Sequence, residues 1–229
     1  MSNPLEDNFK FVPMETEKKL FSLTNRPTPS ERELEWDKTK ILLSKTDSRG
    51  NILYANESFI DVCGYDDFEL MDKSHNLLRH PDMPKVIFKL LWENLSKGKD
   101  YNVIIKNMSK TGRFYWVVND ITTATDDNEN MFFTGKQKTI SNEIINNHIE
   151  PLYKKLLHIE QASGIQSSEN YLLGFLEERN KSYIQFINDL VTTGKDSISS
   201  EQLTVGGLQQ KKKGFFSGFF ADEAPKKEK

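Results

Sequence analysis

Three strand-like segments follow one another in the middle of the chain, and they constrain its fold more than any other feature. These segments are Tyr101–Met108, Arg113–Thr122 and Met131–Thr139. The turn residues Ser109–Gly112 and Asp126–Glu129 separate them, as glycine and short polar residues do in β-hairpins. Strands joined by such short connections pair in the antiparallel sense. The pattern therefore predicts an antiparallel sheet.

Two further strands are expected upstream. The segments Ile41–Lys45 and Ile52–Ala55 flank Asp47–Asn51, whose residues favour a tight turn. Strands grouped at both ends of a domain, with helices between them, are typical of α+β proteins in which the helices cover one face of the sheet. We therefore predict a single α+β domain over residues 31–140, built on a five-stranded antiparallel sheet.

Two clear helices are predicted between the strand groups. Asn56 stands at the N-cap of the first and Gly64 follows its last turn, because asparagine accepts bonds from free N–H groups and glycine adopts the left-handed conformation. In the second, apolar residues recur at helical spacing over residues 84–96. Asp82 is the expected N-cap of this second helix.

A helical extension is predicted after the sheet, over residues 141–193. Its first part carries an apolar stripe with heptad-like spacing, formed by Ile145, Ile149, Leu152, Leu156 and Ile159. Pro151 lies inside the stripe, so the helix either kinks there or begins there. A second helical segment covers residues 169–191, and Asn180 is its expected break. The stripe is too short to hold alone, so it must pack on the sheet, on the second segment or on a second chain as a homodimer.

Both ends of the chain are predicted to be disordered. Residues 1–30 form a polar, proline-containing arm without periodicity, and residues 194–229 form a polar tail. The tail contains three lysines at 211–213 and a phenylalanine-rich motif at 214–220. A docking peptide for a membrane surface or a partner is the alternative interpretation of that motif.

Charge and cysteine content exclude several classes of protein. The formal net charge of -3 argues against non-specific binding to nucleic acid. No apolar segment approaches the length needed to span a membrane, and the N-terminus lacks the pattern of a secretory signal. Cys63 is the only cysteine, which excludes a disulfide or a cysteine-based zinc site within one chain. We therefore expect a cytoplasmic protein without a metal site.

The densest group of chemically active side chains lies at His75–Pro84. One interpretation is a tight loop in which Asp82 caps the next helix and pairs with Arg79. The other interpretation is a ligand site.

Alternation along the strands bears on this choice. It places Asn107 on the same face as Tyr101, and Asn119 on the same face as Tyr115. An asparagine on an otherwise apolar face needs a partner or a ligand, which suits a pocket between sheet and helices. Alternatively, Asn107 lies at a strand end in water.

Several motifs together resemble the PAS domain of bacterial aerotaxis receptors. They are Tyr54–Phe59 (YANESF), Cys63–Tyr65 (CGY), His75–Pro84 (HNLLRHPDMP), Lys106–Asn107, Gly112–Val117 (GRFYWV) and Glu150–Lys154 (EPLYK). The resemblance covers residues 33 to about 160, and the RHPDMP string is its specific part. It implies a PAS fold for the α+β domain and a role in signal transduction.

In that family the PAS pocket binds FAD noncovalently, and the redox state of the flavin is relayed to a chemotaxis signalling domain as oxygen or energy status. Carried over by motif position, the FAD contacts are Asn56, Arg79, His80, Asp82, Tyr101, Asn107 and Tyr115. The chain lacks the membrane segments and signalling helices of those receptors. The resemblance therefore implies a chemoreceptor-like or other signalling protein as partner, and no catalytic residues: the protein is not expected to be an enzyme.

Two positions depart from the family pattern. Tyr101 stands where a tryptophan is usual, and Val103 replaces a glycine on the same inward face and takes up room. The alternative function is a PAS interaction module without flavin, which binds another small ligand or none.

Other candidate sites are weaker. His148–Leu152 resembles the phosphoacceptor motif of sensor kinases, but no glycine-rich ATP-binding region follows. Cys63 does not lie in the cysteine motif of the LOV photoreceptors, so we interpret it as a buried small apolar residue. Haem is not expected, because haem-binding PAS sensors commonly carry a histidine on the long helix and residues 84–96 contain none. His75 and His80 are the alternative haem ligands.

Overall fold

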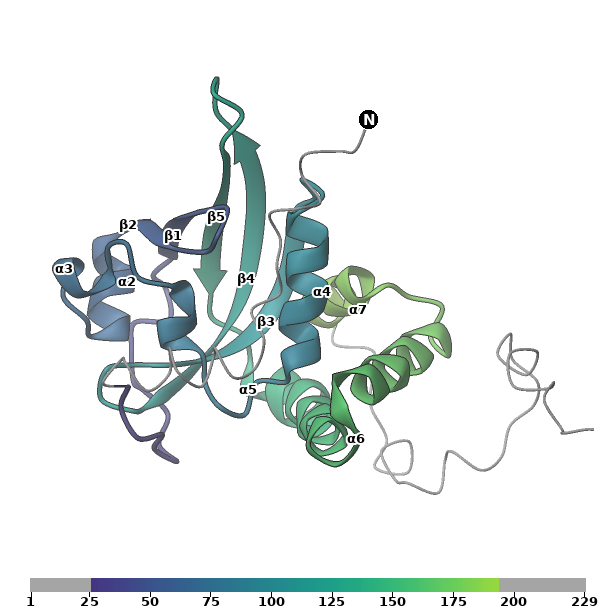
Figure 1. The fold of residues 1–229 in the computed structure, drawn as a ribbon. Coiled ribbons are helices and arrows are strands. Elements are labelled where there is room, and N and C mark those ends of the chain that lie inside the picture. The colour runs from purple at the N-terminus through teal and green to yellow at the C-terminus, as the bar shows by residue number, and fades with distance from the viewer. Residues whose placement is uncertain (1–25, 194–229) are drawn as a thin grey trace, which may run out of the picture. The chain divides into compact units, whose positions relative to one another are not determined.

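The computed structural model describes residues 26–193, which contain a five-stranded antiparallel sheet in the order β2-β1-β5-β4-β3 (Figure 1). The strands are β1 (Leu42–Asp47), β2 (Ile52–Ala55), β3 (Tyr101–Met108), β4 (Phe114–Thr125) and β5 (Met131–Lys138). Every neighbouring pair is antiparallel. The predicted five-stranded α+β fold is therefore confirmed.

Two strands are longer than their local sequence predicts. β1 continues to Asp47, which pairs with Phe132 of β5. β4 continues to Thr125, which pairs with Met131 of β5. Pairing with β5 supplies backbone partners to residues that have turn-like character in isolation, and tertiary context overrides weak β-propensity in this way.

The helices between β2 and β3 are α2 (Glu57–Cys63), α3 (Asp67–Leu70), η1 (His75–Leu78) and α4 (Lys85–Leu95). The predicted ends of α2 are confirmed. The Asn56 side chain accepts from the Phe59 N–H at 3.0 Å, and Gly64 ends the helix with a φ of 72°. That value lies in the left-handed region that glycine adopts without strain.

The predicted cap of α4 is wrong. Pro84 occupies the N-cap position without a side-chain bond, and the carboxylate of Asp82 lies 2.6 Å from Nζ of Lys106 instead. Glu160, from the helical extension, accepts from the backbone N–H groups of Lys85 and Val86 at 2.9 and 2.8 Å. Lys106 on β3 binds the Asp82 carboxylate, and Glu160 caps the helix in place of Asp82. Neither contact could be predicted from local sequence.

One face of the sheet packs on η1 and α4, and we call it the inner face. The rings of Trp92 on α4 and Phe133 on β5 meet edge to face there, with centroids 5.7 Å apart. Side chains of β3 and α4 form the adjoining apolar core: Val103, Ile105, Val86, Ile87 and Leu91 are all buried. The opposite face carries Lys106 and Trp116, and we call it the outer face.

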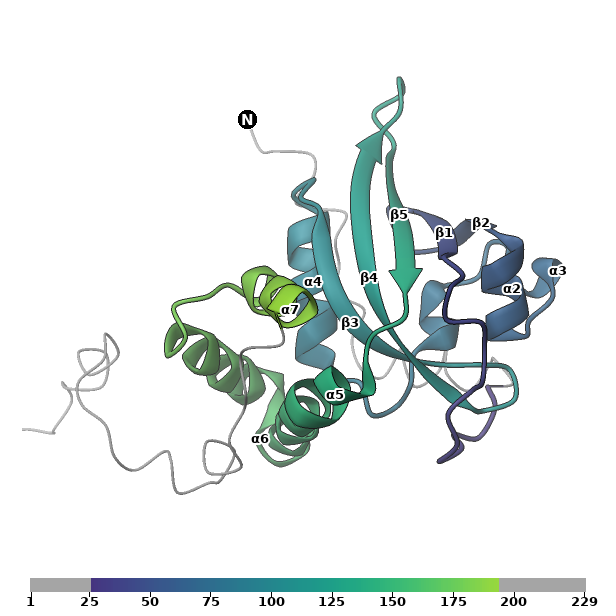
Figure 2. The ribbon, with the colours of Figure 1, turned by 180° about the vertical axis from the view of Figure 1, so that it is seen from behind.

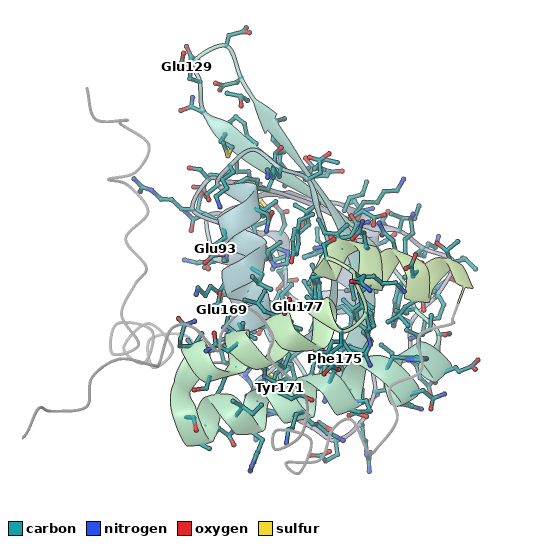
Figure 3. All side chains as sticks on the ribbon, turned by 90° about the vertical axis from the view of Figure 1, so that its right-hand side faces the viewer. Glu93, Glu129, Glu169, Tyr171, Phe175 and Glu177 are labelled. Carbon is teal, nitrogen blue, oxygen red and sulfur yellow. The ribbon has the colours of Figure 1, made fainter. Side chains whose placement is uncertain are left out.

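The helical extension consists of α5 (Asn142–Ile144), the π-helical turn η2 (Ile145–Ile149), α6 (Glu150–Glu177) and α7 (Tyr183–Thr193). Pro151 lies in the first turn of α6, where its missing N–H costs no helical bond. Gly164, with φ 82° and ψ 171°, folds α6 back on itself as two arms (Figure 3). The predicted break at Asn180 is confirmed by its φ of 52°.

The extension packs on the domain of its own chain, with α7 beside β3 (Figure 2) and α6 beside α4. Four members of the predicted apolar stripe are buried and the fifth is half-buried: Ile145, Ile149, Leu152 and Leu156, then Ile159. The hydroxyl of Ser168, on the second arm of α6, donates to the carbonyl of Leu156 at 3.1 Å. The stripe is therefore covered within the chain.

Other predictions concern the ends. Residues 1–25 and 194–229, including the lysines and the phenylalanine-rich motif, lie outside the described residues. Of the predicted N-terminal arm, Ser30 donates its N–H to the carbonyl of Gly112 at 2.8 Å. No helix within residues 26–193 combines the length and the apolar character that a membrane span requires.

Candidate ligand-binding site on the inner face

Polar side chains gather on the inner face because of strand register. Asn107 of β3 lies opposite Tyr115 of β4, and Asn119 of β4 lies opposite Gln137 of β5. Paired residues in an antiparallel sheet project to the same side. Three adjacent strands therefore present three carboxamides and a phenol to one buried surface.

Three of these groups carry atoms with an unused hydrogen-bonding capacity. The Tyr115 hydroxyl, Asn119 Oδ1 and Gln137 Nε2 are buried and have no hydrogen-bond partner among residues 26–193. Asn107 Nδ2 donates to Gln137 Oε1 at 3.3 Å, a long contact. Each unsatisfied buried group costs about 1–3 kcal/mol of folding free energy. A bound ligand that paired with these atoms would remove that cost.

Gly135 makes room for this cluster. It lies on β5 two residues before Gln137, and a Cβ atom at its position would lie 2.9 Å from Asn119 Oδ1. Real Cβ contacts avoid that distance, so any larger residue would displace the Asn119 amide. The glycine therefore sets where the amide oxygen points.

A neutral histidine adds to the inner face. His75 Nε2 lies 3.2 Å from the Ser44 hydroxyl of β1, and its ring meets Phe59 edge to face. Burial lowers the pKa of His75 to about 4, and burial raises the pKa of Tyr115 well above its ordinary value. Both groups are therefore uncharged near neutral pH, and they suit the edge of a neutral ring.

The structure divides the predicted contact residues into three groups. Asn107 and Tyr115 lie in the inner-face cluster, and Tyr101 lies on the same face at the other end of β3. Arg79 forms a backbone bridge with Asn107. Its guanidinium donates to the Met83 carbonyl at 3.0 Å.

His80 and Asp82 lie beyond the edge of β3, beside a lysine of the outer face. His80 packs edge to face on Phe114, and Nζ of Lys106 bonds Asp82 and lies 4.4 Å from the centre of the Phe114 ring. Burial, followed by the charge of Lys106, lowers the pKa of His80 to about 4. The predicted pairing of Asp82 with Arg79 is replaced by the pair with Lys106.

Asn56 is committed to the backbone. Its side chain accepts from the N–H groups of Leu43 and Phe59 and donates to the carbonyl of Ile41. It therefore ties α2 to β1, and its amide atoms are all engaged in this tie.

Four inner-face residues were absent from the predicted contact set: Ser44, His75, Asn119 and Gln137. Alternation along β4 places Asn119 on the same face as Tyr115. Alternation along β5 likewise places Gln137 on the same face as Gly135. Their unsatisfied atoms become visible only once the register between β4 and β5 is known. The place of His75 at the inner face could be recognised only from the packing of η1 against β1.

Two other candidate groups are inaccessible. Cys63 is buried on α2, its thiol donates to the Ile60 carbonyl at 3.4 Å, and burial raises its pKa to about 11. His148 is buried in η2, which does not suit a phosphoacceptor. Within residues 26–193 no three histidine, cysteine or carboxylate side chains gather as a metal site.

Comparison with known proteins agrees with this architecture. The PAS fold family matches residues 52–135. The aerotaxis receptor of Escherichia coli (strain K12) is 38% identical over 116 residues, which cover 50% of this chain and 22% of the receptor. The nitrogen fixation regulatory protein of Klebsiella pneumoniae is 30% identical over 86 residues, 38% of this chain and 17% of that protein.

A longer but weaker match is the blue-light photoreceptor of Listeria monocytogenes, 24% identical over 164 residues, 68% of this chain and 64% of the photoreceptor. Among solved structures, the light state of the Aureochrome1 LOV domain superposes with a TM-score of 0.42 at 22% identity, over 53% of this chain and 91% of that one. The chain spans less than two thirds of the length of these curated relatives. From the family match and the identity to the receptor, the chain carries a PAS sensor domain of the aerotaxis-receptor type.

Proposed function

We propose that this protein is a cytoplasmic, non-catalytic sensor that binds a flavin, FAD in the first instance, on the inner face of its PAS domain. It would report redox, energy or oxygen status to a chemotaxis signalling partner. The observation that carries the proposal is the trio of buried, unsatisfied atoms on Tyr115, Asn119 and Gln137. The similarity to the aerotaxis receptor supports the link to taxis.

The inner face fits the hydrogen-bonding edge of a flavin ring. That edge presents carbonyl acceptors on either side of a ring N–H donor. Asn119 Oδ1 would accept from the N–H, while Gln137 Nε2 and the Tyr115 hydroxyl would donate to carbonyl oxygens. The buried side chains of Val103 and Ile105 provide an apolar surface for a flat ring system.

A bound flavin supplies reversible oxidation and reduction. The residues of this chain hold its edge and keep water away. A carboxamide has both a donor and an acceptor, so Asn107 and Gln137 can hold a ring edge in more than one protonation state. Tyr101, Tyr115 and Arg79 remain proposed contacts.

The remaining predicted contacts have a supporting role in this proposal. His80 and Asp82 hold the loop before α4 against β3, and Asn56 holds α2 against β1. They would shape the site through the backbone, and a flavin phosphate at the edge of β3 would accept a hydrogen bond from His80, while the anionic Asp82 carboxylate would not contact it directly.

The signalling partner would meet the helical extension or the exposed part of the sheet. A homodimer through the apolar stripe requires the extension to leave its own domain first, because Leu152 and Leu156 are fully buried in it. We therefore propose a chemoreceptor-like partner as the main output.

The test begins with the purified full chain. We expect a yellow protein with absorbance in the blue, and FAD in the supernatant after boiling, identified by chromatography against FMN and riboflavin. The double variant N119L/Q137L removes the unsatisfied pair and should retain little flavin. Asn146 is exposed on η2, so N146L serves as the control and should retain the wild-type amount.

A colourless protein that cannot be loaded with FAD, FMN or riboflavin would contradict the proposal. That result would favour the interaction module without flavin. Equal flavin content in N119L/Q137L and the wild type would instead show that the flavin binds somewhere other than the inner face.

A further inference from the structure

Helix α4, which covers the inner face, does not cap its own N-terminus. Its N-cap residue is Pro84, which has no side-chain acceptor. The side chain that caps the helix belongs to Glu160 in the first arm of α6. Its two carboxylate oxygens accept separately, at 2.9 Å from the Lys85 N–H and at 2.8 Å from the Val86 N–H.

This contact is favourable for two physical reasons. It satisfies N–H groups that have no partner within the helix, and it places a negative charge at the positive end of the helix dipole. A side-chain cap stabilises the helix whose N–H groups it satisfies. Here that stabilisation depends on a residue 74 positions further along the chain than Val86.

A second carboxylate of α6 holds the middle of α4. Glu169 is nearly buried on the second arm, and its carboxylate lies 2.6 Å from Nζ of Lys89. Gln166 donates to the same carboxylate at 3.0 Å. Lys89 also lies 3.7 Å from Glu93, so it stands between the two carboxylates labelled on α4 and α6 in Figure 3.

The extension also packs on β3, the strand that carries Asn107. The ring of Tyr183 on α7 stacks on Tyr101 with an interplanar angle of 3° and centroids 5.9 Å apart. Asn188 of the same helix accepts from Asn102 of β3 at 2.9 Å. The helix and the strand on either side of the candidate site are therefore both attached to one helical unit.

We infer that Glu160 is a positioning residue that couples the helical extension to the ligand site through α4. The inference rests on the proposed function, because it concerns the regulation of the same site. A ligand that shifts α4 must lengthen or shorten the two Glu160 contacts, and release of the extension must uncap α4. Binding free energies linked in this way are reciprocal, so ligand and extension each bias the state of the other.

The substitution that tests the inference is E160Q, which keeps the shape and removes one acceptor and the charge. We expect FAD to bind about three- to tenfold more weakly, the factor that corresponds to loss of part of a helix cap. In the wild type, FAD should alter amide hydrogen exchange in residues 150–163. In E160Q that response should be lost. E177Q changes an exposed glutamate at the end of α6 and should behave as the wild type.

A third variant separates coupling from simple stabilisation. P84D/E160Q supplies α4 with a local N-cap, so exchange protection at residues 85–88 should recover. If the coupling runs through Glu160, the response of residues 150–163 to FAD should remain absent. Recovery of that response together with the local cap would show that Glu160 only stabilises α4, and an unchanged FAD affinity and response in E160Q would also overturn the inference.

Failure of the proposed function is distinguishable from failure of the coupling. If the wild type binds no flavin, Q137L perturbs the inner face without a ligand. Coupling then predicts that Q137L changes the exchange of residues 150–163 when Glu160 is present and leaves it unchanged in the E160Q background. A Q137L effect on α4 that never reaches residues 150–163 would overturn the coupling.

Discussion

The hydroxyl of Tyr153 on α6 lies 2.5 Å from the hydroxyl of Tyr183 on α7, and both are buried. Tyr153 donates its proton to the carbonyl of Ile104 on β3 at 2.8 Å, so Tyr183 must donate to Tyr153. This chain of two bonds joins both long helices of the extension to the edge strand of the sheet. Burial raises the pKa of both phenols, so the chain is uncharged.

Removal of the Tyr153 hydroxyl should weaken the attachment of the extension. Y153F leaves a buried carbonyl and a buried hydroxyl without a partner, which costs about 1–3 kcal/mol. Urea unfolding measures the loss. Tyr54 is 52% exposed on β2, so Y54F should be within error of the wild type, and equal midpoints for both variants would disprove the role of the hydroxyl chain.

A charge in the buried stripe should detach the extension. Leu156 is fully buried, whereas Leu173, on the other arm of α6, is 51% exposed. L156D places an unpaired charge in an apolar interface and should destabilise the chain by about 3–5 kcal/mol. L173D should have a small effect. Limited proteolysis of residues 141–193 reports detachment, and a resistant L156D protein would show that the stripe is not essential for packing.

Stability should fall as the pH drops below 6.5. The pKa values of His75 and His80 are about 4 in the folded protein, against an ordinary value of 6.5. Between these values the unfolded chain binds protons that the folded protein excludes, so the free energy of unfolding rises with pH across this window. Thermal midpoints at pH 4.5 and 7 measure the slope.

The same measurement identifies the histidines responsible. H75Q should reduce the slope by about half, because two histidines share the effect. His158 is exposed on α6, so H158Q should leave the slope intact. A wild-type protein equally stable at both pH values would refute the assignment.

The absence of a side chain at Gly135, beside Asn119, should be needed for full ligand affinity. In G135A the new Cβ pushes the Asn119 amide away from its position, and loss of one ligand hydrogen bond corresponds to on the order of tenfold in FAD affinity. Titration of the protein with FAD measures the change. Gly174 is an exposed glycine of α6 with nothing near its Cβ position. G174A should therefore stabilise the chain by about 1 kcal/mol and bind FAD as the wild type does. An undiminished FAD affinity in G135A would exclude Asn119 as a contact.

Local sequence alone determined the presence and order of the five strands, their alternation and the two ends of α2, but not the full lengths of β1 and β4. Asn56 and Gly64 act on N–H groups and a backbone angle within a few residues of themselves, so their roles do not depend on the rest of the fold. The placement of Asn107 with Tyr101 on one face of β3, and of Asn119 with Tyr115 on one face of β4, follows from the period of a strand. These features were sufficient to predict the α+β fold, whereas the register between β3 and β4 brings Asn107 opposite Tyr115.

Only the tertiary structure decided which partner each polar group takes. Asp82 had the position of a cap, yet Lys106 binds it, and Glu160, 75 residues further along the chain than Lys85, caps α4. Gln137 joined Asn119 as a candidate because the register of β4 and β5 buries them together. Electrostatic and hydrogen-bonding partners are chosen by distance in space, and in this chain those distances depend on strand register and on where the first arm of α6 packs against α4.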